Sequence, residues 1–167
     1  VDEEMRISLA NRSASEIAGV SEPEITGMRC GDMLGCVNRA AEGALCGETP
    51  ECTACSLYRD VRATLTSGTT VVQREKEFDL EVPGDESGAV RRVWLRYSTS
   101  HVTLSRRNAV LVTIKDITSE RETQERIRVL SKVADSNGTI VIVTDAERRT
   151  TWVNDNFERL TGYSLAD

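Results

Sequence analysis

Residues 90–118 read VRRVWLRYSTSHVTLSRRNAVLVTIKDIT, and this stretch decides the fold class. In its first half, apolar side chains occupy every second position, at Val93, Leu95 and Tyr97. The second half repeats this period from Val110 to Ile114. A period of two is typical of a β-strand that buries one face. We therefore predict strands over residues 90–102 and 108–117.

The residues before this stretch supply a third strand and a helix. Residues 70–82 have the composition of a strand and lead into the turn signal of residues 83–88, PGDESG. Residues 56–67 place Leu57, Val61 and Leu65 on one helical face, and Gly68 follows as a C-terminal cap. Antiparallel strands with one apolar face need a cover, and the upstream helices are available for it. The predicted fold class is α+β.

Shorter elements are predicted nearer the N-terminus. Residues 6–10 alternate like a strand and lead into Asn11, an N-cap residue, and a short helix that stops at Gly19. Residues 21–27 form a second short helix with a proline in its first turn. Residues 28–55 show no sustained period and are predicted to be a long loop, which is normally functional or held by something.

After Thr118 the chain becomes strongly charged. A heptad-like seam of spacings four, three and four runs through Thr123, Ile127, Leu130 and Ala134. We predict a linker helix over residues 119–135. Its narrow apolar stripe indicates a partner helix, most simply the same segment in a homodimer. A single solvated connector is the alternative.

The end of the chain repeats its beginning. Residues 144–164 align without gaps on residues 1–21 at a constant offset of 143, pairing Asn11 with Asn154 and Gly19 with Gly162. Internal duplication explains this register better than chance does. We expect one domain over residues 1–118, a linker over residues 119–135 and the N-terminal part of a second domain over residues 136–167, in a piece of a longer protein.

Composition excludes several classes of function. The net charge is −6, from 21 basic and 27 acidic residues, which disfavours a surface for nucleic acid or anionic membranes. We expect no nucleic-acid partner, no direct membrane contact and a cytoplasmic location, because no long apolar run or signal-peptide pattern occurs. No nucleophile elbow, P-loop or HExxH motif is present, so we do not expect an enzyme.

All five cysteines lie in the 26 residues from Cys30 to Cys55. Cys36, Cys46, Cys52 and Cys55 are separated by nine, five and two residues, and a C-x2-C pair can bind one ion from a single turn. Four thiolates without a nearby histidine suit zinc or an iron–sulfur cluster, and the spacing does not choose between them. A redox-active thiol or disulfide set and plain buried cysteines are the alternatives. Cys30 is the predicted spare.

The order of these motifs resembles that of the PAS domain, a sensory module of bacterial signalling proteins. The matching pieces are the acidic turn of residues 2–4, Asn11, Gly19, residues 24–27 (EITG), the three strands, residues 116–118 (DIT) before a charged helix, and residues 160–164 (LTGYS) in the second copy. The resemblance implies a five-stranded antiparallel sheet of order 2-1-5-4-3, its first strand mostly before Val1, with short helices on one face enclosing a ligand pocket. It also implies a signal-relay role for Asp116, Ile117 and Thr118, which lie where the last strand of PAS proteins leads into a signalling helix.

The cysteine segment resembles a subset of PAS domains in histidine kinases and diguanylate cyclases, through Gly35-Cys36, Cys46-Gly47 and Cys52-x2-Cys55. This implies redox or oxygen sensing through a centre on the four cysteines. An iron–sulfur cluster is the preferred cofactor because it responds to oxidants, and zinc is the alternative. Loss of the centre is expected to free residues 30–55 and shift residues 116–134, which would signal to a C-terminal output domain in cis. The alternative function is a small-molecule-binding PAS domain whose cysteine loop is stabilised by structural zinc or a disulfide.

Overall fold

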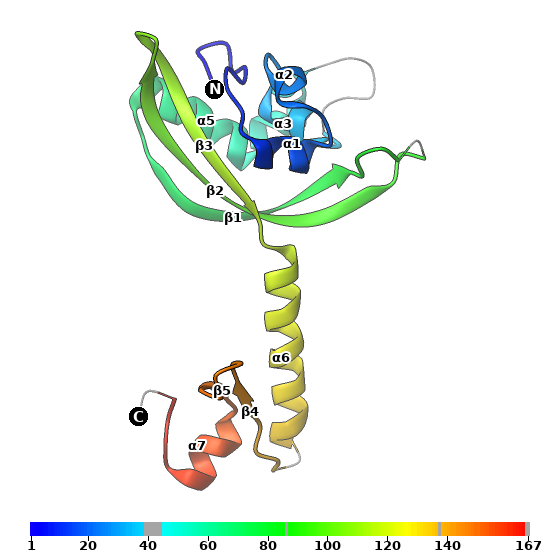
Figure 1. The fold of residues 1–167 in the computed structure, drawn as a ribbon, viewed down its shortest axis with the longest axis vertical. Coiled ribbons are helices and arrows are strands. Elements are labelled where there is room, and N and C mark those ends of the chain that lie inside the picture. Colours follow the sequence, from blue (N-terminus) through cyan, green and yellow to red (C-terminus); the bar gives the residue numbers. More distant parts are fainter. Residues whose placement is uncertain (39–44, 86, 137, 166–167) are drawn as a thin grey trace. The chain divides into compact units, whose positions relative to one another are not determined.

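The chain forms two compact units in a computed structural model, Val1–Thr118 and Ser119–Asp167 (Figure 1). The structure describes residues 1–38, 45–85, 87–136 and 138–165. Residues 39–44 of the predicted cysteine loop, Glu86 of the predicted turn and the last two residues of the predicted second domain lie outside this range.

The first unit contains the predicted antiparallel strands, β1 (Val71–Glu81), β2 (Val90–Leu104) and β3 (Arg107–Asp116), in the order β1-β2-β3. A tight turn joins β2 to β3, and its two central residues, Ser105 and Arg106, have φ angles of 51° and 65°. Positive φ at both positions is the geometry of a type I′ hairpin. The order 2-1-5-4-3 of a five-stranded sheet is not seen among the described residues, and it stays a prediction.

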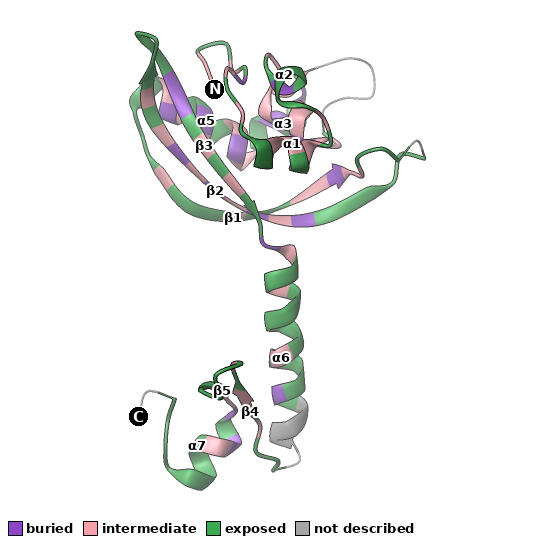
Figure 2. Cartoon of the chain, viewed as in Figure 1, coloured by how far each residue is buried: buried purple, intermediate pink, exposed green. Residues whose placement is uncertain are grey.

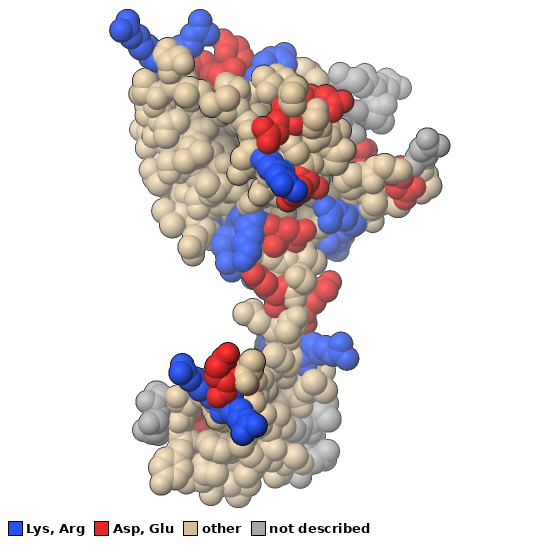
Figure 3. Space-filling model, in the orientation of Figure 1, with Lys and Arg blue, Asp and Glu red and all other residues tan. Residues whose placement is uncertain are grey.

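In the middle of β2, buried residues alternate with less buried ones, as predicted (Figure 2). Val93, Leu95 and Tyr97 are at most 2% exposed. On the opposite face, cross-strand ion pairs join β2 to β1, such as Arg92 to Asp79 at 2.9 Å. Basic and acidic side chains are likewise interspersed on the face drawn in Figure 3.

Helices cover the apolar face of the sheet, as predicted (Figure 1). The helices described before the sheet are α1 (Arg12–Ala18), α2 (Glu22–Ile25), α3 (Cys30–Leu34), α4 (Pro50–Ala54) and α5 (Ser56–Ser67). Leu57 and Val61 of α5 are buried against the sheet, and Gly68 ends α5 in the left-handed conformation with φ of 71°. The core combines residues from α3, α5 and all three strands: Leu34, Leu57, Val61, Leu80, Val93, Leu95, Tyr97 and Val110.

Two local predictions were wrong. Residues 28–55 are not a continuous loop, because α3 and α4 form within them; Gly35 caps α3 at a φ of 68°, and Thr49-Pro50 begins α4. Helices of five residues are too short to show a period in the sequence. Residues 6–10 are not a strand, because Ile7 instead exchanges backbone hydrogen bonds with Gly27 and Met28, each 2.8 Å long.

The second unit repeats the acidic turn and the helix caps of residues 1–21, but residues 150–153, which align with residues 7–10, form a strand here. It contains β4 (Ile142–Thr144), β5 (Thr150–Val153) and α7 (Asp155–Thr161), after α6 (Thr118–Ser136), the predicted linker helix. Asn11 and Asn154 each accept a hydrogen bond from the backbone three residues on, and Gly19 and Gly162 end their helices at φ angles of 71° and 75°. The same caps therefore recur at the offset of 143 residues. No described helix combines the length and the apolar content needed to span a bilayer.

Candidate functional site

All five cysteines line one cavity of about 380 Å³ in the first unit. The cavity lies between the cysteine segment, the start of α5 and β1, where residues 76–79 form part of its wall. Cys30 begins α3, Cys52 lies in α4, and Cys55 joins α4 to α5. The five cysteines, which span 26 positions of the sequence, thus line the same cavity.

Cys36 is positioned by backbone contacts with β1. It forms an isolated antiparallel bridge with Leu80, and the flanking residues extend this pairing. The Glu81 N–H donates to the Gly35 carbonyl at 2.7 Å, and the Val37 N–H donates to the Asp79 carbonyl at 3.2 Å. The edge of β1 therefore fixes where the Cys36 thiol lies.

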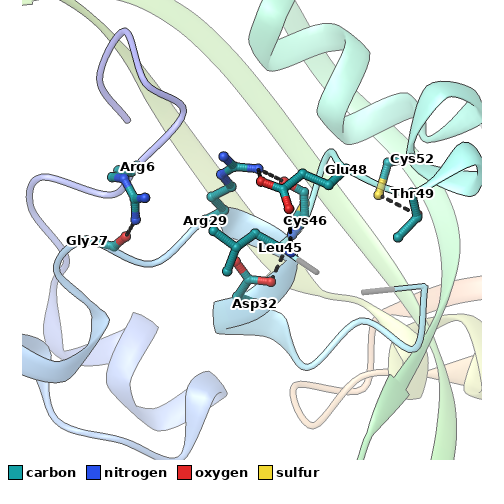
Figure 4. A network of polar contacts seen from close by, with 9 residues as sticks. All are labelled: Arg6, Gly27, Arg29, Asp32, Leu45, Cys46, Glu48, Thr49 and Cys52. Carbon is teal, nitrogen blue, oxygen red and sulfur yellow. Dashed lines mark hydrogen bonds and ion pairs between the residues drawn. The ribbon is translucent and has the colours of Figure 1, made fainter. Parts of the chain in front are cut away.

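Cys46 is positioned by side chains of α3 and its N-cap (Figure 4). Its N–H donates to Asp32 Oδ1 at 3.0 Å, and its carbonyl accepts from Arg29 Nη1 at 2.7 Å. Arg29 also pairs with Glu48 at 3.1 Å. A Cβ at Gly31 would lie 2.7 Å from Cys46 Sγ and 2.9 Å from Cys46 Cβ. Cys46 can therefore occupy this space because Gly31 has no side chain.

Cys52 is a buried thiol that accepts a hydrogen bond. It is 4% exposed, and the Thr49 hydroxyl donates to its sulfur at 3.2 Å (Figure 4). Burial acts to raise the pKa of the Cys52 thiol, but hydrogen bonds from Thr49, the Gly47 backbone and the Cys46 thiol lower it below the ordinary value. Burial raises the pKa of Cys30 to about 11 and that of Cys46 to about 12.

The predicted ligands Cys36, Cys46, Cys52 and Cys55 are brought to one cavity, and so is Cys30, the predicted spare. Position alone therefore does not distinguish Cys30 from the other four. In the part of the chain that the structure describes, no three His, Cys, Asp or Glu side chains are close enough to hold a metal ion. The donor chemistry suits a thiophilic centre, and binding one requires these thiols to approach each other further.

No sequence pattern indicated the residues that position the thiols, above all Arg29, Gly31 and Asp32. Their role depends on Cys46, which is 14 to 17 residues away in the chain, and no local pattern reports such a contact. Thr49 could have been found, because a threonine directly before a proline is a typical start of a helix.

The predicted relay residues form a turn pinned to β2. The Ile117 N–H donates to the Trp94 carbonyl at 2.8 Å, and the Trp94 N–H donates to Thr118 Oγ1 at 2.9 Å. The Thr118 N–H and hydroxyl both donate to Asp116 Oδ1, at 2.9 and 2.6 Å. Ile117 is 1% exposed. Thr118, the last residue of the first unit, is therefore tied to β2, the middle strand of the sheet.

Comparison with known families agrees with this architecture. Two family models, each described as PAS domain, match the chain, one over residues 1–119 and the other over residues 125–167. No curated protein matches it.

Proposed function

Because the chain belongs to the PAS domain family, whose members generally act as sensory signalling modules, we propose that residues 1–118 sense redox state or oxygen through a thiol-ligated centre. One observation carries this proposal: every cysteine of the chain lines the same cavity, at the place where the domain packs its helices on the sheet. The proposed role is regulatory and not catalytic.

Cys36, Cys46, Cys52 and Cys55 are the proposed ligands. An iron–sulfur cluster would supply a centre whose oxidation state follows the oxidants around it, and zinc, the alternative, would supply a fixed tetrahedral crosslink. Cys36 lies in the segment after α3 that bridges to β1, and Cys46 lies in the segment before α4. Cys52 lies in α4, and Cys55 lies at the junction of α4 and α5. Binding at all four thiols therefore depends on how these three segments pack.

The sheet offers a route from the cavity to the relay turn. Glu77 of β1 lines the cavity, and its partner in the β1–β2 register is Trp94. The backbone of Trp94 in turn holds Ile117 and Thr118. We propose that a displacement of β1 reaches the first turn of α6 through this pair of strands.

The test is metal and sulfide analysis, with an absorption spectrum, of the protein purified without oxygen. We expect stoichiometric iron and sulfide, with zinc as the outcome that favours the alternative centre. Cys52→Ser and Cys55→Ser should lose the metal, whereas Cys30→Ser, which removes a thiol from the same cavity, should retain it. Wild-type protein free of both metals would refute the thiol-ligated centre.

A bound small molecule is the second candidate function. Arg29 lines the cavity, and its Nε is buried without a hydrogen-bond partner among the described residues. A buried donor without a partner is costly, so it favours a ligand that offers an oxygen acceptor. Native mass spectrometry should then show an organic ligand on the wild-type protein and much less on Arg29→Gln. Equal occupancy in both proteins argues against this candidate.

α6 is the segment on which we base proposals for a partner chain and for an output domain. In the predicted seam, Leu130 is 58% exposed, Thr123 is exposed and Ile127 is half-buried; the side chain of Ala134 is outside the described ones. We propose that this stripe forms a homodimer and that the output domain in cis is a histidine kinase or diguanylate cyclase. Light scattering of Leu130→Glu beside the wild type tests the dimer.

A further inference from the structure

Lys76 of β1 is a charged residue on the apolar face of the sheet. Its partner in the β1–β2 register is Leu95, which is 2% exposed. Directly opposite side chains of an antiparallel pair lie on the same face, so Lys76 is on the side that the helices cover. Lys76 is itself exposed and lines the cysteine cavity. Its ammonium group therefore belongs to the opening of the cavity.

The other cation on this face of β1, Arg74, has a partner. Arg74 Nη1 donates to both carboxylate oxygens of Asp60 in α5, each at 2.8 Å. The hydroxyl of Tyr97, which is opposite Arg74 in the register, donates to the same carboxylate at 2.7 Å. No described residue forms an ion pair with Lys76. The charge of Lys76 is therefore available to a bound anion.

The acidic side chains that line the cavity do not neutralise Lys76. Glu77 and Asp79 each pair with Arg92 of β2, at 3.9 and 2.9 Å. Glu51 of α4 is exposed and is not within ion-pair distance of Lys76. The lining acids therefore leave room for the negative group of a ligand beside Lys76.

Most of the remaining cavity wall is apolar. Leu34 and Leu57 are buried there, and Phe78 is half-buried. The volume of about 380 Å³ lies within the range of small-molecule pockets. Arg29, the other lining cation, is paired with Glu48 at 3.1 Å. One unpaired cation beside an apolar wall suits a ligand with a single negative charge and a hydrocarbon part.

We propose that the cavity binds an amphipathic monocarboxylate, whose carboxylate pairs with Lys76 and whose hydrocarbon part contacts the apolar wall. This proposal rests on the second candidate function, a bound small molecule, and names the class of that molecule. Burial of the hydrocarbon part supplies most of the affinity. The ion pair at the opening adds a smaller contribution, which salt screens.

The experiment compares octanoate, which is ionised at neutral pH, with 1-octanol, which has the same chain length and no charge. Isothermal titration calorimetry of the reduced protein gives both affinities. We expect Lys76→Met to weaken octanoate binding about two- to fivefold and to leave 1-octanol binding unchanged. Lys76→Gln should behave in the same way. Lys132→Met, the matched control, removes a lysine that does not line the cavity and should bind both compounds as the wild type does.

Two outcomes would overturn the role of Lys76 and leave the cavity as a ligand site. In one, wild type and both Lys76 variants bind octanoate equally well. In the other, the Lys76 variants lose octanoate and 1-octanol to the same extent, which would show a disturbed cavity and not a lost ion pair. Wild-type protein that binds neither compound would overturn the ligand class itself. Native mass spectrometry of Arg29→Gln tests the bound small molecule separately.

Discussion

Replacement of Gly31 by alanine should destabilise the protein, although alanine favours helices. Gly31 is buried in α3, and its new Cβ would lie 2.9 Å from Cys46 Cβ and 2.7 Å from Cys46 Sγ. Rotation of the thiol can relieve only the second contact. The Cβ contact requires the backbone of Cys46 to move, and Asp32 and Arg29 hold that backbone by hydrogen bonds of 3.0 and 2.7 Å.

Two opposing effects set the size of the change. Alanine in place of glycine stabilises a helix by about 0.5–1 kcal/mol, with the low end applying to a helix as short as α3. Overpacking of a closely packed site costs about 1–3 kcal/mol. The free energy of unfolding of Gly31→Ala should therefore fall by about 0.5–2.5 kcal/mol.

A double-mutant cycle with Cys46→Gly isolates the contact, because glycine removes both Cys46 atoms. Urea unfolding of the four metal-free, reduced proteins gives the free energies. In the Cys46→Gly background, Gly31→Ala should be neutral or stabilising by up to about 1 kcal/mol. A Gly31→Ala cost that is equal in both backgrounds, or a gain in the wild-type background, would show that Gly31 does not make room for Cys46.

Three further predictions concern the core, the cysteine segment and the relay turn. Burial and a hydrogen bond to Asp60 raise the pKa of Tyr97 to about 12. As the pH rises from about 10 to 12, the free energy of unfolding should therefore fall by on the order of 1–2 kcal/mol more in the wild type than in Tyr97→Phe. Parallel curves of unfolding free energy against pH for the two proteins would contradict this. Gly47→Ala puts a side chain on a residue with a φ of 98° and places its Cβ 2.5 Å from the Tyr58 ring. It should lower the free energy of unfolding in urea by at least about 2 kcal/mol. A cost near zero would show that the turn can rearrange. Thr118→Val removes the acceptor of the Trp94 backbone N–H in β2. It should lower the free energy of unfolding by about 1 kcal/mol and speed hydrogen exchange at that amide. Unchanged hydrogen exchange would argue that Thr118 does not hold the turn to β2.

The fold of the first unit was predictable where one element spans several periods of its pattern. The strands and α5 are long enough for the apolar period to appear, and the predicted bounds of α5 agree with the structure residue for residue. The internal repeat was visible because its N-cap and C-cap residues, Asn11 and Gly19, have local roles that recur at Asn154 and Gly162. Capping residues act within their own helix, so they can be recognised in the sequence without knowledge of the tertiary structure.

The sequence showed that the cysteines cluster in residues 30–55, but it did not predict the helices that form there. Its short helices depend on contacts such as the Cys36–Leu80 bridge, which joins residues 44 positions apart. The role of Gly31 depends on where Cys46 lies, and a glycine inside a helix reads in the sequence only as a weak helix former. How close the thiols come to one another is likewise set by tertiary packing, so the spacing alone left zinc, an iron–sulfur cluster and a disulfide open as alternatives.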